Sequence, residues 1–146
     1  MEKLRFALDI EDEWPPVATE SVWCERSGNL YVLKNAPFFI KGLAFGDGFT
    51  AEPDPVNGCI FEFEVIETSG NSLVWVLNTD NLDFSGTKDE LSALGCQVEG
   101  FPQFNLFSVD VPASADADAV NALVDRIEER GYALAFPVWR HEASGA

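Results

Sequence analysis

The stretch FNLFSVDVPASADADAVNALVDRIEERGYALAFPVW, residues 104–139, gives the clearest structural signal in the chain. Its first part, residues 104–111, alternates in the manner of a β-strand. Residues 116–130 then form an amphipathic helix in this interpretation, and Gly131 provides its stop. Residues 132–139 are predicted to be a final strand. The apolar face of the predicted helix consists of Val120, Leu123, Val124 and Ile127.

Upstream of this stretch, a second helix is predicted. The sequence TKDE at residues 87–90 fits a capping box at its start, and Gly95 fits its end. A strand over residues 73–77 precedes it. The second half therefore predicts a ferredoxin-like β-α-β-α-β unit. The first half predicts short antiparallel strands that form a small barrel or extend the sheet. These strands are expected at residues 6–10, 20–25 and 30–33, from about residue 48, and at 60–67.

Strands in the first half and helices in the second predict the α+β class. At 146 residues, the chain has the length of one domain. We expect a single α+β domain over residues 1–140 and a frayed C-terminal tail over residues 141–146.

The charge is strongly unbalanced, with 25 acidic residues against 9 basic ones and a formal net charge of -16. Nucleic acids and anionic membranes bind basic patches, so the composition argues against both as partners. A basic protein is the partner that such a surface attracts. The oligomeric state is left open by these observations.

The three cysteines, Cys24, Cys59 and Cys96, lie far apart and form no CxxC motif. This spacing predicts reduced, partly buried thiols and argues against a disulfide framework or a zinc site. The N-terminal residues contain no uninterrupted apolar run typical of a signal peptide. We therefore expect a cytoplasmic protein that has no cofactor and no metal.

No catalytic constellation emerges from the sequence, and we expect a protein that is not an enzyme. The single histidine, His141, falls in the predicted tail, where it could not act as a rigidly held base. Asp47 lies between two glycines and is either a turn former or a ligand. Together with nearby aromatic residues it defines an alternative cleft, made of Phe38, Phe39, Phe45 and Asp47. The other interpretation of these aromatic side chains is that they are core.

Four segments resemble a bacterial family known as domain of unknown function 4265. They are ESVWC (20–24), NAPFFIKGLAFGD (35–47), TSGNS (68–72) and LSALGCQVEG (91–100). The resemblance extends over about residues 4–139, and its departure is at Gly48 and Phe49, where aliphatic residues would be expected. It implies a small bacterial cytoplasmic domain and supplies no established activity and no catalytic residues.

The leading functional hypothesis is an acidic binding protein, namely a bacterial immunity protein that neutralises a cognate toxin by covering a basic active site. The alternative is a regulatory domain that binds a small molecule or peptide through residues 38–49. Exposed acids opposite the predicted apolar stripes give the expected partner-binding surface. They are Glu62, Glu64, Asp118, Asp125, Glu128 and Glu129.

Overall fold

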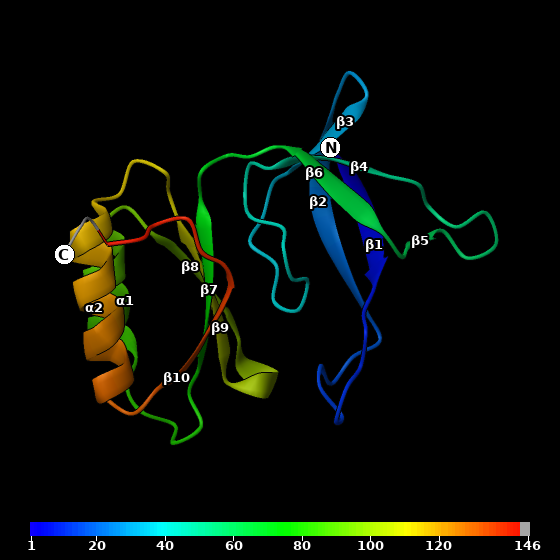
Figure 1. Ribbon diagram of the computed structural model, residues 1–146. Coiled ribbons are helices and arrows are strands. Elements are labelled where there is room, and N and C mark those ends of the chain that lie inside the picture. Colours follow the sequence, from blue (N-terminus) through cyan, green and yellow to red (C-terminus); the bar gives the residue numbers. More distant parts are fainter. Residues whose placement is uncertain (144–146) are drawn as a thin grey trace. The chain divides into compact units, whose positions relative to one another are not determined.

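The computed structural model describes residues 1–143 and divides into two compact units, Met1–Ser69 and Gly70–Ala146 (Figure 1). Each unit has its own β-sheet and its own hydrophobic core. The α+β class is confirmed, since the chain combines two sheets with two helices. The single domain expected over residues 1–140 stays a prediction, and the units are described separately below.

The first unit is a curled six-stranded sheet in the order β5-β1-β2-β3-β4-β6. Neighbouring strands are antiparallel except β1 and β5, which are parallel. These strands form a sheet of their own and do not extend the second sheet. Their bounds are β1 (Glu2–Ala7), β2 (Thr19–Ser27), β3 (Leu30–Leu33), β4 (Gly48–Ala51), β5 (Cys59–Ile60) and β6 (Phe63–Glu67).

Aromatic rings fill the interior of this curled sheet. The ring of Phe6 lies 5.9 Å from that of Phe49 and 5.6 Å from that of Phe63, between centroids. Val22 and Leu33 contribute aliphatic side chains that are fully buried. One strand was predicted over residues 60–67, in which alternation puts Phe61 on the same face as Phe63 and Val65, and this prediction is wrong. The strand is interrupted at residues 61–62, and Phe61 is 61% exposed.

The second unit contains the elements β-α-β-β-α-β in chain order, with one more strand than the sequence predicted. Its antiparallel sheet has the order β10-β7-β9-β8. Both helices pack on this sheet through apolar side chains. The bounds are β7 (Ser72–Leu77), α1 (Ser85–Ala93), β8 (Gln97–Phe101), the 3-10 turn η1 (Pro102–Phe104), β9 (Leu106–Val111), α2 (Ala117–Glu129) and β10 (Ala133–Val138).

The two helices differ in how well the sequence predicted their starts. In α2 the predicted apolar stripe is confirmed, and Asp116 caps the helix by accepting the backbone N–H of Asp118 at 3.2 Å. In α1 the predicted capping box is wrong, because the helix begins at Ser85 and has no side-chain cap. Thr87 is instead a buried helical residue whose Oγ1 accepts a hydrogen bond from Arg130.

The placement of His141 in a frayed tail over residues 141–146 is also corrected. His141 is only 4% exposed and belongs to the packed interior of the second unit. The side-chain amide of Asn121, on α2, donates to the His141 carbonyl at 2.6 Å and so ties this segment to the helix. Residues 144–146 of the predicted tail lie outside the described residues.

Candidate functional site

A wide groove of about 1000 Å³ lies in the first unit, between the loop that follows β4 and the start of β6. The loop is shaped by Asp54, whose carboxylate accepts the backbone N–H of Val56 at 2.8 Å. Arg5 on β1 fixes the loop by donating to the Asn57 carbonyl at 2.7 Å. The residues that line the groove are Thr50, Ala51, Glu52, Pro53, Asp54, Pro55, Phe61, Glu62, Phe63 and Glu64.

The groove is acidic. Its lining, among the described residues, contains four carboxylates, Glu52, Asp54, Glu62 and Glu64, and no basic side chain. Within residues 1–143, none of these four carboxylates is neutralised by a salt bridge. Like charges gathered in a concave surface raise the local concentration of cations. The groove therefore favours a positively charged ligand.

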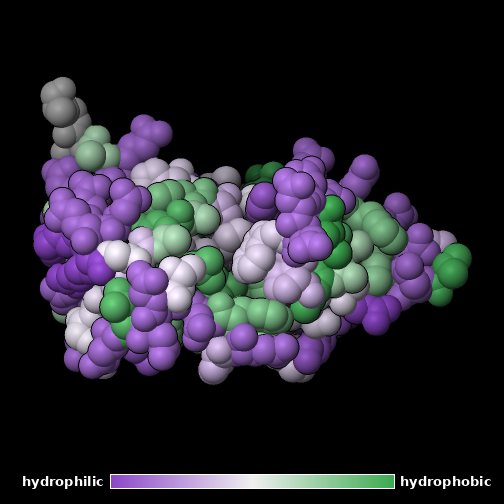
Figure 2. All heavy atoms as spheres, turned by 90° about the horizontal axis from the view of Figure 1, so that it is seen from below, coloured by the Kyte–Doolittle hydropathy of each residue, from purple (hydrophilic) through white to green (hydrophobic). Residues whose placement is uncertain are grey.

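The groove also presents apolar surface. Phe61 is 61% exposed, and Phe63 is half-buried beside it. An exposed aromatic face among carboxylates suits a cationic side chain, because the ring attracts the cation and the carboxylates pair with it. Figure 2 shows that apolar patches interrupt a largely hydrophilic surface on the face that it presents. Most lining residues are exposed, so the groove suits a protein segment better than an enclosed small molecule.

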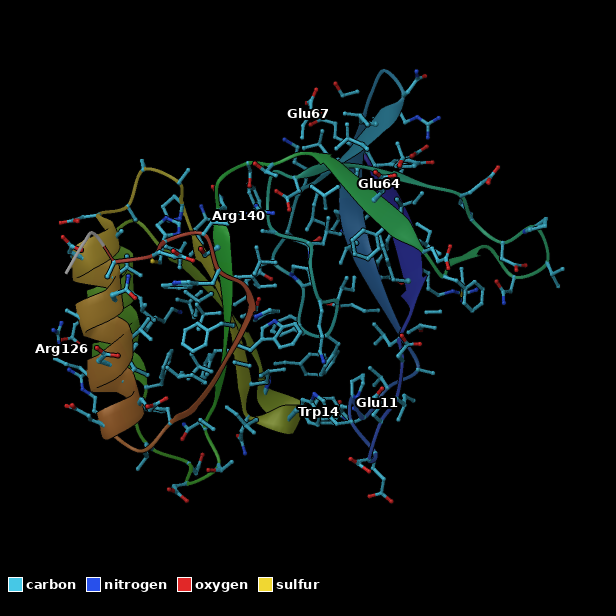
Figure 3. The ribbon with its side chains drawn as sticks, viewed as in Figure 1. Glu11, Trp14, Glu64, Glu67, Arg126 and Arg140 are labelled. Atoms are coloured by element: carbon cyan, nitrogen blue, oxygen red, sulfur yellow. The ribbon has the colours of Figure 1, made fainter. Side chains whose placement is uncertain are left out.

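The six acids predicted to contact a partner are all exposed, as expected from their periodicity. The structure brings two of them, Glu62 and Glu64, together in the groove. Figure 3 shows Glu64 with Glu67 on the same strand, β6. The remaining four belong to α2 of the second unit, and their role stays a prediction. These four are Asp118, Asp125, Glu128 and Glu129.

Among the groove residues that sequence reasoning missed are two acids, Glu52 and Asp54, and the exposed ring of Phe61. The pattern that could have indicated Glu52 and Asp54 as site residues is the alternation of acids and prolines, EPDP, at residues 52–55. The same pattern is typical of an ordinary loop. Alternation with its neighbours assigns Phe61 to the core. The break between β5 and β6, which the alternation does not reveal, turns its side chain out to solvent.

The segment at residues 38–49, the alternative cleft, is fixed by Glu20. The carboxylate of Glu20 accepts backbone N–H groups from Phe38 at 2.7 Å, Phe39 at 2.8 Å and Ile40 at 3.1 Å. Burial raises the pKa of Glu20 above its ordinary value of 4.5, and the three hydrogen bonds act in the opposite direction. The side chains of Phe39 and Ile40 are buried.

Asp47 is a turn former and not a free ligand in this structure. Its side chain is fully buried and accepts the backbone N–H of Ala44 and that of Ser69, each at 2.9 Å. Gly46, just before it, has a φ of +85°, which an L side chain rarely adopts. The two remaining cleft residues, Phe38 and Phe45, are half-buried, and binding at this segment stays a prediction.

In the second unit, Ser72 and His141 form a contact that resembles a nucleophile–base pair. The distance between Ser72 Oγ and His141 Nδ1 is 2.6 Å. The Pro112 carbonyl can only accept, so His141 donates to it through Nε2 at 2.8 Å. Ser72 Oγ, which is hydrogen-bonded to Nδ1, also accepts the backbone N–H of Arg140 at 2.7 Å. Ser72 is 0% exposed, so a substrate has no access to its hydroxyl.

All three cysteines are free and buried. Burial raises the pKa of Cys24 to about 12 and that of Cys96 to about 11, with a smaller contribution from Glu2 and Asp110 respectively. A thiol with such a pKa is almost entirely protonated near neutral pH and is a poor nucleophile or metal ligand.

A second hollow, of about 620 Å³, lies where α1 begins in the second unit. Arg130 is the cation that lines this hollow. It is engaged within the fold, because it donates hydrogen bonds to Glu90 at 2.6 Å and to Thr87 at 3.0 Å. Other polar lining groups are engaged within the fold, such as Asp83 with Ser85. The acidic groove of the first unit is the better candidate for a binding site because its carboxylates form no ion pair within residues 1–143.

Among residues 1–143, no group of three or more His, Cys, Asp or Glu side chains is arranged to hold a metal ion. None of the described helices has the length and apolar character needed to cross a membrane.

These features define a small α+β protein that carries an acidic groove on a curled β-sheet. The chain belongs to the family described as Domain of unknown function (DUF4265), whose model matches residues 20–134. A similar fold occurs in the structure described as "Novel crystal structure of a hypothetical protein from Neisseria gonorrhoeae". The two share 16% sequence identity at a TM-score of 0.74, over 94% of this chain and 96% of that one. No curated protein matches this chain.

Proposed function

We propose that this protein is a non-enzymatic acidic binding protein, and specifically an immunity protein that neutralises a toxin by covering its basic active site. The observation that carries the proposal is the groove, where four carboxylates and an exposed Phe61 stand without a compensating cation among the described lining residues. A toxin that acts on nucleic acid has a basic active site, because it must hold phosphate groups. Carboxylates in the groove would occupy the positions of those phosphates.

The net charge of -16 supports the same function. A large charge of one sign accelerates association with an oppositely charged partner and disfavours wrong partners. The buried polar groups also support a binding role in preference to catalysis, because Ser72, His141 and Asp47 satisfy one another or the backbone inside the fold.

Two finer points accompany the proposal. We place the protein in the bacterial cytoplasm, where free cysteines remain reduced. We also assign the second unit to the ferredoxin-like arrangement. Its β-α-β-β-α-β order and its antiparallel sheet β10-β7-β9-β8 support this assignment.

The direct test is co-expression with a toxin encoded beside this gene. If the neighbouring gene product ends in a toxin domain and stops growth when expressed alone, co-expression of this chain should restore growth. The purified pair should bind, with an association rate that decreases as salt concentration rises. A toxic neighbour that this chain neither binds nor neutralises would refute the immunity role. An association rate independent of salt would refute the electrostatic account.

A further inference from the structure

Strand β6 is an edge strand that runs along the acidic groove. It hydrogen-bonds with β4 on one side and is the last strand of the sheet on the other. Within residues 1–143, the backbone of β6 forms no hydrogen bond beyond its ladder with β4. An edge of this kind can pair with an extended segment of another chain.

The side chains of β6 set the requirements for such a segment. Glu64 and Ile66 are exposed, and they alternate with Phe63 and Val65, which are half-buried. A strand added beside β6 would place every second side chain on the face that carries Glu64 and Ile66, with the groove carboxylates nearby. The intervening side chains would lie beside Phe63 and Val65. This pattern calls for basic residues alternating with aliphatic ones.

The negative charge around β6 distinguishes between two possible partners of this edge, a second copy of the chain and a cationic strand. A second copy of the chain would bring its own acidic groove and a further net charge of -16 to the same place. Like charges directly across a strand pair are destabilising, whereas opposite charges stabilise it. The acidic edge therefore disfavours self-association and favours a cationic strand.

We infer that the partner adds a strand to the free edge of β6, with Lys or Arg at alternate positions directed at Glu62, Glu64 and the ring of Phe61. This inference rests on the proposed function and names the element of the partner that the groove recognises. Main-chain hydrogen bonds to β6 would provide affinity, and the carboxylates would provide selectivity for basic side chains.

The test uses a fluorescent peptide, about ten residues of alternating Lys and Val, titrated with the protein at low ionic strength. Its comparison peptide has the same side chains and charge, but its central Lys and Val residues carry N-methyl groups, which remove the N–H donors on both strand edges. We expect the unmodified peptide to bind at least tenfold more tightly than the N-methylated one. Backbone amide resonances of residues 63–67 should shift in its presence.

Protein variants locate the contact. Glu64→Lys should weaken binding of the unmodified peptide at least tenfold, and Phe61→Ala should weaken it severalfold. The matched control is Asp89→Lys, an exposed acid on α1 that changes the net charge by the same amount. Both charge-reversal variants are compared with the wild type at one salt concentration that screens long-range charge, where Asp89→Lys should alter binding less than twofold.

Equal binding of both peptides, or equal losses in Glu64→Lys and Asp89→Lys, would overturn strand addition, because overall charge alone would then explain the attraction. The proposed function would survive that result. Absence of binding by the unmodified peptide at low salt would also overturn strand addition. Co-expression with the neighbouring toxin would then decide the immunity role separately.

Discussion

The Oγ atom of Ser72 and the Nδ1 atom of His141 lie 2.6 Å apart, although 69 positions separate the two residues in sequence. Ser72 opens β7, and His141 follows β10, which pairs with β7. The contact therefore closes the end of this strand pair and extends, through His141 Nε2, to the Pro112 carbonyl after β9.

His141→Ala should destabilise the protein, because the buried Ser72 hydroxyl and the Pro112 carbonyl would both lose a hydrogen-bond partner. We expect a loss of about 1–3 kcal/mol in the free energy of unfolding, measured with urea. The neighbouring Glu142→Ala is the control, since Glu142 is exposed and its removal should change stability by less than about 0.5 kcal/mol. Equal stabilities of the two variants would show that this contact contributes nothing.

Glu20→Gln tests the carboxylate that holds residues 38–40. Oxygen Oε2 accepts from Phe38, and Oε1 accepts from Phe39 and Ile40, so an amide NH₂ at either position would face an N–H donor. We expect a loss of about 1–3 kcal/mol in stability. Glu25→Gln, an exposed position on the same strand, is the comparison. An unchanged unfolding midpoint in Glu20→Gln would contradict the structural role assigned to this carboxylate.

The ionisation of the buried Asp110 side chain should make the protein less stable as pH rises. Burial raises its pKa above the ordinary value of 3.8, while the hydrogen bond from Asn71 and the charge of His141 act in the opposite direction. The native state thus holds the Asp110 proton more tightly than the unfolded state. Its contribution to stability is fully present below pH 3.8 and is lost as pH rises through the native pKa.

The measurement is unfolding by urea at a series of pH values for the wild type and for Asp110→Asn. Asparagine does not titrate and can still accept the Asn71 amide proton at its oxygen. The stability of the variant relative to the wild type should therefore increase as pH rises above 3.8. A difference that stays constant with pH would contradict a raised pKa of Asp110 in the native state.

The cysteines should be unreactive in the native protein. The high pKa values of Cys24, about 12, and Cys96, about 11, leave little thiolate at neutral pH, and all three thiols are buried. A thiol-specific reagent should react slowly with the native chain and rapidly with three groups after denaturation. Rapid native labelling of Cys24 or Cys96 would contradict the burial described here.

The sequence predicted features that depend on short-range periodicity. The stripe of α2 repeats apolar residues over several turns, so periodicity alone assigns Val120 and Ile127 to the core, where both are buried. Strand β8 was missed because it is an edge strand with a weak pattern, in which Val98 is half-buried and Gly100 has no side chain to alternate. At Gly100 a Cβ atom would lie 3.3 Å from the ring of Phe107, so close packing accounts for the glycine.

Long-range polar contacts could not be predicted in the same way. Glu20 meets its backbone partners across 18 to 20 positions, and no local pattern distinguishes it from the exposed Glu25. The sequence did not predict the acidic groove, and only two of its acids, Glu62 and Glu64, were among the expected partner-binding residues. Its remaining acids come from a loop whose path is set by Arg5, a residue more than 50 positions away.

The contrast between Glu20 and Glu64 has a consequence for how this family can diversify. Glu20 fixes the backbone of residues 38–40 through three hydrogen bonds, so a change there would disturb the structure of the first unit. Glu64 is exposed on β6 and forms no ion pair within residues 1–143 that its replacement would disrupt. If the proposed binding role holds, related proteins could therefore exchange the acids of the groove to fit different partners and keep the same scaffold.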